Sequence, residues 1–214
     1  MVFFTRRFLP VTGTSIGNLD EGAIITLNEN ASPVEFYVAK QDYESGLNGA
    51  GRVLAVRKDC YDNRAWDAGK VSAYATSDID AWFNGAYKGL LDPDVQEALG
   101  TTKFYYTPGN GNWTVGTLER AVFALSVTEL GESHTYANTE GSALPIANTL
   151  KIAYLNGIAT GQWTRSPHML NTAYAWFLDS DGSIGADYCR SSWGSRPSYT
   201  LPATFKLSDS QIVS

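Results

Sequence analysis

Gln-Trp-Thr-Arg-Ser-Pro at 162–167 is the first of two short arginine-proline motifs, which we call frames. The second is Trp-Gly-Ser-Arg-Pro at 193–197, and the rest of the chain is organised around the stretch between them. In each frame an arginine precedes a proline within two residues. A guanidinium has five donors and can tie loop carbonyls together, whereas proline supplies no backbone donor. We therefore predict that both frames are scaffold. The scaffold residues are Trp163, Arg165, Arg196 and Pro197.

The segment between the frames has the composition of a binding surface. Asp181-Gly182 separates apolar runs at 173–178 and 183–188, which predicts a β-hairpin with a type I′ turn. Tyr and Trp provide contact area at a low cost in conformational entropy, and small polar residues adapt to a partner. Ordinary loop residues would have the same composition, and this alternative stays open. The candidate binding residues are His168, Met169, Asn171, Tyr174, Asp187, Tyr188, Arg190, Ser191 and Trp193.

The first half of the chain predicts a small sheet followed by two helices. Residues 23–27 and 34–39 are apolar runs joined by a turn-rich segment, and residues 52–57 follow as a third strand. This order predicts an antiparallel meander. Residues 77–87 begin with a capping-box pattern, and residues 93–99 begin with proline after aspartate, so both segments predict short helices.

Three further elements are predicted in the middle of the chain. Residues 103–106 predict a strand, and the continuous apolar run at 121–126 predicts a buried central strand. Residues 144–155 carry apolar side chains at helical spacing, and Asn156-Gly157 after them is a stop signal. The expected fold class is therefore α+β, with mostly antiparallel strands, about three short helices and a loop-rich C-terminal hairpin region.

Length and composition predict one such domain. Contents of 43% hydrophobic and 18% charged residues are typical of a globular chain, and 13% aromatic residues with 20 glycines favour β-structure with many turns. A length of 214 residues suits one domain with a single core. We expect an N-terminal arm or attachment segment at 1–20, the domain at 21–207 and a tail at 208–214.

The charge of the chain restricts its partners. A net charge of −6 and a pI near 4.9 argue against nucleic-acid binding, because a phosphate backbone needs a basic surface. No apolar run approaches the ~20 residues of a membrane span, and the opening residues make a poor signal peptide. Cys60 and Cys189 are expected to be independent buried thiols, while a single disulfide between them stays open. Proteins or glycans are the expected partners.

No constellation of residues points to catalysis. His134 and His168 lie outside any zinc or triad pattern, and no Gly-x-Ser-x-Gly elbow is present. The carboxylates Asp59, Asp62 and Asp67 suit turn capping and pairing with nearby cations better than they suit a metal ion. We therefore expect a protein that is not an enzyme, with no catalytic residue, no metal site and no cofactor. A glycosidase with an unassigned carboxylate pair is an alternative.

Several short motifs, in their order, resemble an uncharacterised domain family common in phages and prophages of gut Firmicutes. The motifs are the two frames, the Asp181-Gly182-Ser183 turn between them, and the segments 53–59, 79–85 and 123–126. This resemblance covers about residues 20–205. The ending is also similar to the C-type-lectin-like fold of formylglycine-generating-type domains and of phage receptor-binding proteins diversified by retroelements. In that fold the last segment before a Gly-x-Arg motif, here Gly194-Ser195-Arg196, forms the exposed ligand surface.

The resemblance implies a C-type-lectin-like, tail-associated virion protein that recognises a host cell-surface protein or glycan through residues 163–201. Other virion proteins are further expected partners, and phage fibres in general suggest a homotrimer. The protein would be made in the cytoplasm of a bacterial host and end up in the virion. A structural virion protein that makes only subunit contacts is the first alternative, and a hydrolase of surface glycans is the second. The metal-bound cysteine pair of the generating enzymes is not matched by Cys60 and Cys189.

Overall fold

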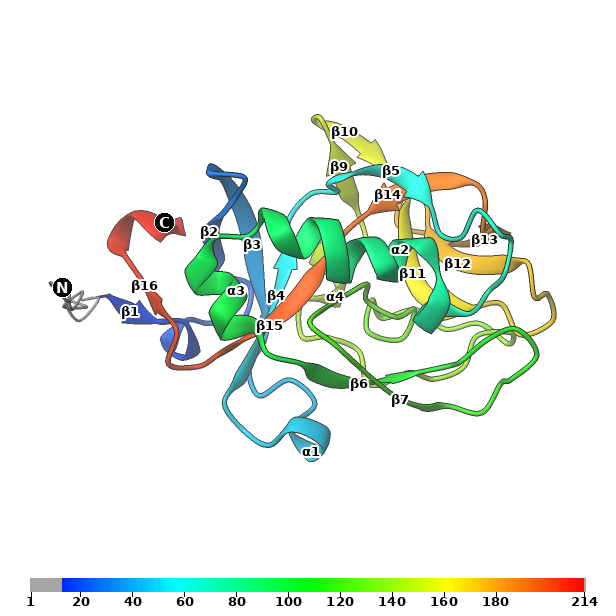
Figure 1. Cartoon of the computed structure of the whole chain (residues 1–214), viewed down its shortest axis with the longest axis horizontal. Helices are drawn as coiled ribbons and strands as arrows, with labels where there is room; N and C mark the ends of the chain where they lie inside the picture. The colour runs from blue at the N-terminus through cyan, green and yellow to red at the C-terminus, as the bar shows by residue number, and fades with distance from the viewer. Residues whose placement is uncertain (1–12, 214) are drawn as a thin grey trace, which may run out of the picture.

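Two sheets form the body of the computed structural model, which describes residues 13–213 (Figure 1). The first sheet has the strand order β17 (Ile212–Val213), β2 (Ile24–Glu29), β3 (Ser32–Lys40), β4 (Arg52–Arg57), β15 (Ser198–Pro202) and β8 (Val122–Phe123). The second has the order β13 (Ile184–Tyr188), β12 (Tyr174–Leu178), β11 (Gln162–Pro167), β14 (Ser192–Ser195) and β5 (Asp62–Ala65). Three small ribbons pair β1 (Thr14–Ser15) with β16 (Lys206–Leu207), β6 (Thr102–Tyr106) with β7 (Gly116–Arg120), and β9 (Ala153–Leu155) with β10 (Ile158–Thr160).

The predicted class of mostly antiparallel strands with a few short helices is confirmed. Every strand pair in the described residues is antiparallel except β11 with β14. The predicted meander is present, because β2 pairs with β3 and β3 pairs with β4. Residues 53–56 of β4 are all buried, as expected for a strand in the middle of a sheet that is covered on both faces.

Two adjacent connections join the sheets. The chain passes from β4 to β5 through residues 58–61, and from β14 to β15 through residues 196–197. Because β4 pairs with β15 and β5 pairs with β14, the two connections lie side by side. The second sequence frame therefore lies where the chain passes from one sheet to the other.

The side chain of Arg196 binds the two connections together, at what we call the junction of the sheets. Its side chain is 3% exposed, and its three nitrogens donate hydrogen bonds of 2.7 Å to three backbone carbonyls, those of Arg57, Lys58 and Leu150. Burial lowers the pKa of Arg196. Each bond joins segments that are remote in sequence, so one guanidinium satisfies carbonyls that no strand neighbour reaches.

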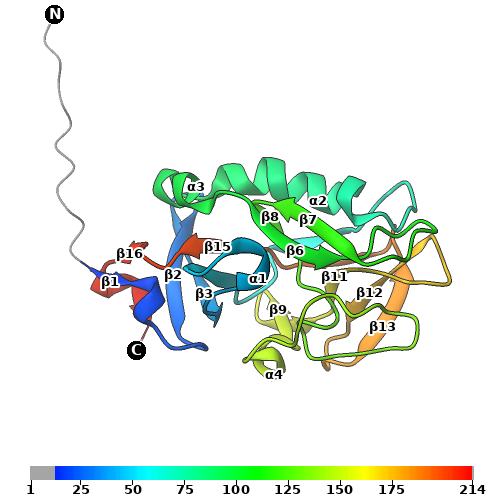
Figure 2. The same ribbon diagram turned by 90° about the horizontal axis from the view of Figure 1, so that it is seen from below.

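The two predicted helices in series are confirmed. Helix α2 (Asp78–Trp82) continues through the π-helical turn η3 (Phe83–Tyr87) and the 3₁₀ turn η4 (Lys88–Leu90), and α3 (Pro93–Leu99) follows. Figure 2 shows α2 and α3 in one row along one side of the molecule. Ser77 caps α2 by accepting a hydrogen bond of 3.2 Å from the backbone N–H of Asp80. The remaining helical segments are η1 (Ile16–Asn18), α1 (Ser45–Asn48), η2 (Tyr74–Thr76), α4 (Ala147–Leu150) and η5 (Asp209–Gln211).

The predicted central strand at 121–126 is wrong in its position. Only Val122 and Phe123 form a strand, β8, at the edge of the first sheet. Side chains satisfy the neighbouring backbone groups instead: Asn84 accepts from the N–H of Ala121 at 3.1 Å, and the Tyr74 hydroxyl accepts from the N–H of Ala124 at 2.9 Å. The run is therefore buried against strand β15, against Phe104, whose ring stacks on that of Phe123, and against the helical segments that carry Asn84 and Tyr74.

The predicted helix at 144–155 is also wrong over most of its length. Helix α4 spans only residues 147–150, and β9 begins at residue 153. Asn156 and Gly157 both have positive φ, as a type I′ turn requires, and they join β9 to β10. The Asn-Gly pair that was expected to end a helix therefore forms a hairpin.

The turn between β12 and β13 differs from the predicted type I′. Only Gly182 has a positive φ there, and its N–H donates to the carbonyl of Asp179 at 2.9 Å. This is a type I turn followed by a left-handed glycine. Asp181 favours it, because its carboxylate accepts from the N–H of Ser183 at 2.9 Å.

The ends of the described chain pack onto the body. Ile16 is fully buried and donates to the carbonyl of Phe205, and β1 pairs with β16. Ile212 pairs with Ile25 at the edge of the first sheet. These contacts belong to parts of the segments 1–20 and 208–214 that were expected to be an arm and a tail. Residues 1–12 and 214 lie outside the described residues.

Both cysteines are free and buried, as predicted. Their sulfurs do not act as ready nucleophiles, because burial raises the pKa of Cys60 to about 11 and that of Cys189 to about 12. Cys60 instead fills the space beside Gly194. A Cβ at position 194 would lie 2.4 Å from the Cys60 sulfur and 2.6 Å from the carbonyl of Gly161.

Gly194→Ala is therefore expected to lower the free energy of unfolding by about 1–3 kcal/mol through overpacking. Urea unfolding followed by circular dichroism measures this loss. Gly85→Ala is the matched control, because a Cβ there meets no atom within 4 Å. Equal stabilities of the two variants would show that the junction tolerates an added methyl group.

Candidate ligand-binding platform

The hairpin of β12 and β13 has two faces of different character. Tyr174 pairs with Tyr188, and Phe177, three residues further along, pairs with Gly185. Because side chains alternate along a strand, these two pairs lie on opposite faces of the hairpin. The face of the tyrosines is partly open to solvent, whereas Phe177 is 8% exposed and belongs to the core.

The exposed face carries a continuous aromatic surface, which we call the platform. The rings of Tyr174 and Tyr188 have their centroids 4.3 Å apart, and Tyr188 is 43% exposed. Trp176, on the same face, is only 4% exposed and forms the base of the surface. The platform consists of His134, Tyr136, His168, Tyr174, Trp176 and Tyr188.

The two histidines of the chain both belong to the platform. The centroid of the Trp176 ring lies 4.5 Å from that of His134 and 4.9 Å from that of His168. Nδ1 of His134 accepts from the N–H of Tyr136, and Nδ1 of His168 accepts from the N–H of Leu170. These bonds assign the proton of each neutral ring to Nε2, so both histidines keep a side-chain donor.

A loop from a distant part of the sequence supplies His134 and Tyr136. The carbonyl of Tyr136 accepts from the indole N–H of Trp176 at 3.2 Å and from the backbone N–H of Met169 at 2.9 Å. These bonds hold the loop against the hairpin. Tyr136 itself is 39% exposed, so it adds contact area beside the tyrosine pair.

Two of the predicted binding residues lie on the other face of the hairpin. Trp193 stacks on Phe177 with the ring centroids 4.4 Å apart and the planes 11° from parallel. The indole N–H of Trp193 donates to the carboxylate of Asp187 at 2.9 Å. The nine candidate residues therefore do not form one surface, and Trp193 and Asp187 pack together away from the platform.

The remaining candidates surround the platform. The guanidinium of Arg190 lies 5.4 Å from the centroid of the Tyr188 ring, and the N–H of Ser191 donates to the carbonyl of Tyr188 at 2.8 Å. Asn171 is exposed, and its side-chain oxygen accepts from the N–H of Ala173 at 2.9 Å. Met169 is partly buried. Seven of the nine candidates thus lie on or beside one surface.

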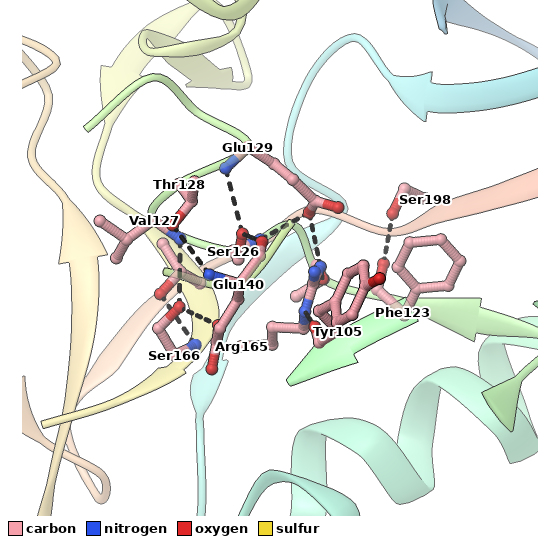
Figure 3. A network of polar contacts seen from close by, with 12 residues as sticks. Tyr105, Phe123, Ser126, Val127, Thr128, Glu129, Glu140, Arg165, Ser166 and Ser198 are labelled. Atoms are coloured by element: carbon pink, nitrogen blue, oxygen red, sulfur yellow. Dashed lines mark hydrogen bonds and ion pairs between the residues drawn. The ribbon is translucent and has the colours of Figure 1, made fainter. Parts of the chain in front are cut away.

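A buried ionic network fixes the strand next to this hairpin (Figure 3). Arg165 on β11 is fully buried, and its Nη1 lies 2.5 Å from the carboxylate of Glu129, which is also fully buried. Nε and Nη1 also donate to the carbonyls of Tyr105 and Ala124. The second carboxylate oxygen of Glu129 accepts from the Tyr43 hydroxyl at 2.5 Å. Burial alone would lower the pKa of Arg165, but Glu129 and Tyr43 raise it, so the guanidinium stays charged.

A second buried carboxylate connects the first frame to the loop of His134 and Tyr136. Glu140 accepts from the Ser166 hydroxyl at 2.5 Å and from the backbone N–H of Thr107 at 2.6 Å. Burial raises the pKa of Glu140. The loop that supplies the platform is therefore anchored at residue 140 as well as at residue 136.

Trp163, the first scaffold residue of the sequence, is 2% exposed and donates its indole N–H to the carbonyl of Arg64 at 3.0 Å. Its ring packs edge-on against Phe177. Pro197 is buried at the junction of the sheets. All four predicted scaffold residues therefore lie in the interior, and none of them reaches the platform.

Three surface cavities are lined by residues outside the platform. The largest of these three, of about 440 Å³, is lined in part by Glu44 and Gly141. Burial raises the pKa of Glu44, with a further contribution from the charge of Glu129. Cavities of about 270 and 250 Å³ lie beside Ile158 and beside Arg57. Within residues 13–213, no group of three His, Cys, Asp or Glu side chains is placed to hold a metal ion.

The pKa of His168 predicts how acid affects the fold. Burial of the ring, with a contribution from His134, lowers this pKa below its ordinary value of 6.5. The folded chain then binds the proton more weakly than the unfolded chain. Stability is therefore expected to be fully present above pH 6.5 and to fall as the pH decreases from there through the folded-state pKa.

An NMR titration of the two histidine side chains measures this pKa directly. Unfolding in urea at about pH 7.5 and about pH 5 should show a larger loss for the wild type than for His168→Gln. Equal losses in the two proteins would show that His168 does not contribute to the acid sensitivity.

The fold and the platform together define a class of protein: a small α+β domain whose two sheets support an exposed hairpin surface. Residues 50–203 match the model of a family described as Domain of unknown function (DUF6273), so the chain belongs to this family. The match runs from the start of β4 to the end of β15 and includes the sheet junction and the platform. No match was found among curated proteins or among solved structures.

Three platform residues were not among the sequence candidates. Trp176 was detectable, since it lies two residues after Tyr174 in a predicted strand and therefore on the same face. His134 and Tyr136 had no such signal, because they approach the hairpin only through loop contacts. No helix of the described residues is long and apolar enough to cross a membrane.

Proposed function

We propose that this protein is a non-enzymatic binding module that recognises a glycan through the platform. The observation that carries the proposal is the Tyr174–Tyr188 pair, whose rings lie 4.3 Å apart on the partly exposed face of a hairpin. The opposite face of this hairpin packs into the core through Phe177. The pair is therefore held in place before a ligand arrives, and little freedom is lost on binding.

A sugar ring is the ligand that suits this surface best. The face of an aromatic ring carries negative partial charge, and it attracts the weakly positive C–H groups on one side of a sugar ring. The polar groups around the platform, among them Asn171 and the two histidines, can bond hydroxyl groups. The three cavities lie elsewhere. An open aromatic surface of this kind is suited to a glycan chain that lies along it.

A binding role also agrees with the chemistry of the titratable groups. Glu129 and Glu140 are fully buried and already bonded to protein groups, so neither is available to a substrate. In the described residues, neither platform histidine has a carboxylate partner of the kind that orients a catalytic base. These four groups therefore give no reason to expect a reaction at the platform.

The proposal extends to the fold family and the setting. A C-type-lectin-like fold is supported by the position of the last loops and hairpin, which precede the frame at 193–197 and carry the platform. Sequence resemblance supports a place on the tail of a phage or prophage particle, with a host cell-surface glycan as the partner. A purely structural virion protein would use the same aromatic surface for contacts between subunits.

A binding screen followed by NMR tests the proposal. The purified chain is applied to a glycan array and to bacterial cells, and a hit is titrated into labelled protein. We expect the largest shifts at the imidazole signals of His134 and His168 and at residues 173–176. Absence of any glycan or cell binding, or shifts confined to the β9–β10 hairpin, would contradict it. Self-association that removes the same signals would identify a subunit contact instead.

A further inference from the structure

One arginine beside the platform is not committed to the protein. Residues 13–213 contain seven arginines, and six of them donate hydrogen bonds to carbonyls, hydroxyls or carboxylates of the chain. Arg190 is exposed, and within these residues its guanidinium makes no hydrogen bond and no ion pair. The ring of Tyr188 lies beside it, with 5.4 Å from the guanidinium carbon to the ring centroid. Five donors are therefore free at the edge of the tyrosine pair.

The carboxylates close to Arg190 in the chain and in space are engaged elsewhere. One oxygen of Asp187 accepts from the N–H of Tyr188 at 2.7 Å, and the other accepts from Trp193 on the opposite face. Asp67, whose backbone N–H bonds to the carbonyl of Cys189, directs a carboxylate oxygen to the N–H of Gly69 at 2.6 Å. Neither carboxylate is paired with Arg190, although the whole chain has a net charge of −6.

The two histidines of the platform are donors as well. Both histidines accept a backbone N–H at Nδ1, and this leaves Nε2–H as the donor of each neutral ring. A planar guanidinium is pre-shaped for two parallel hydrogen bonds to a carboxylate or phosphate group. The aromatic surface is therefore bordered by groups that match negative charge in a ligand.

We propose that the platform selects an acidic glycan, one that carries carboxylate or phosphate groups. A sugar ring stacks on Tyr174 and Tyr188, and the acidic group of that sugar or of its neighbour pairs with Arg190. This inference rests on the proposed function and adds to it the chemical class of the ligand. The binding should weaken as the salt concentration rises, because the ion pair is exposed.

Matched pairs of glycans test the inference. Uronic-acid, sialylated and phosphate-bearing oligosaccharides are each compared with the methyl-esterified, desialylated or dephosphorylated form of the same chain. We expect at least one acidic probe to bind at least about tenfold more tightly than its neutral counterpart. Comparison of the carboxylate-bearing probes with the phosphate-bearing probes shows which acidic group is recognised.

Arg190→Gln should remove this preference by weakening the acidic probe about tenfold and leaving the neutral one within about twofold. Arg190→Lys should retain part of it, because the charge remains but the two-donor geometry is lost. Lys206→Gln is the control, since Lys206 on β16 lies at the opposite end of the molecule from β13 (Figures 1 and 2).

Equal binding of acidic and neutral probes would overturn this inference, and so would an acidic preference that Arg190→Gln leaves unchanged. Neutral glycan binding that still depends on Tyr174 and Tyr188 would then leave the proposed function standing. Failure of every probe, acidic and neutral, would contradict both. Binding of a sugar-free acidic peptide with the same dependence on Arg190 would show that the ligand is a protein and would also overturn the inference.

Discussion

Replacing Arg165 by methionine is expected to lower the free energy of unfolding by about 3–5 kcal/mol, the range for breaking a buried ion pair by removing one partner. Glu129 would keep its bonds to Tyr43 and Ser126 but would lose the charge that compensates it. The carbonyls of Tyr105 and Ala124 would lose their donor as well. Because small domains are stable by only about 5–15 kcal/mol, this is a large part of the total.

Chemical unfolding of the wild type and four variants measures the effect and separates its parts. Arg165→Met is compared with Glu129→Gln, with the double variant and with Arg190→Met. The double variant should lose less than the sum of the two single changes, with a coupling of about 0.5–3 kcal/mol, because Glu129 no longer leaves an uncompensated charge when Arg165 is removed. Arg190→Met should stay within about 0.5 kcal/mol of the wild type. Equal losses for Arg165→Met and Arg190→Met would refute a stabilising role of the buried pair.

The second large effect is expected on binding. Changing Tyr174 and Tyr188 together to alanine should weaken the glycan found in the screen by at least about 30-fold, or about 2 kcal/mol. The two rings form the central exposed part of the platform, and alanine removes nearly all of their contact area. Their contribution to stability as a cross-strand pair is expected to be only about 0.2–1 kcal/mol.

Calorimetric titration and thermal unfolding of the same samples distinguish loss of binding from loss of fold. Tyr154→Ala is the matched control, because Tyr154 is 44% exposed but lies on the β9–β10 ribbon. Trp193→Ala should show the opposite pattern, with lower stability and nearly unchanged affinity, because Trp193 packs on Phe177. If the tyrosine variant binds as the wild type does, the ligand lies elsewhere on the molecule.

Local patterns predicted those elements whose structure depends on neighbouring residues. Ser77 caps α2 as expected, and the apolar runs at 23–27 and 34–39 with the turn-rich segment between them form the β2–β3 hairpin. The run at 121–126 was placed in the middle of a sheet, because an apolar segment says that it is buried but not what covers it. Its backbone groups bond to the side chains of Asn84 and Tyr74, and Phe123 stacks on Phe104. All three partners are remote in sequence.

The candidate site was predicted in part, for the same reason. Tyr174 and Tyr188 were both assigned to one hairpin, but the predicted two-residue turn at Asp181-Gly182 would have placed Tyr174 opposite Cys189. The longer turn that the structure contains pairs Tyr174 with Tyr188. Trp193 was expected beside them, but strand β11 lies between β12 and β14, and stacking on Phe177 places Trp193 on the opposite face. Alternation along a strand is readable from sequence, whereas the order of strands in a sheet depends on contacts across the whole chain.

Local sequence patterns were enough to predict mostly antiparallel strands with a few short helices, the first meander, the two helices in series and a hairpin around Asp181-Gly182. Each follows from turn chemistry, capping or periodicity within a few residues. Only the tertiary structure decided that residues 196–197 lie at the junction of the two sheets and that the loop of Tyr136 completes the platform. Those features depend on which buried polar groups find partners across 40 or more residues, and local propensity does not encode such pairing.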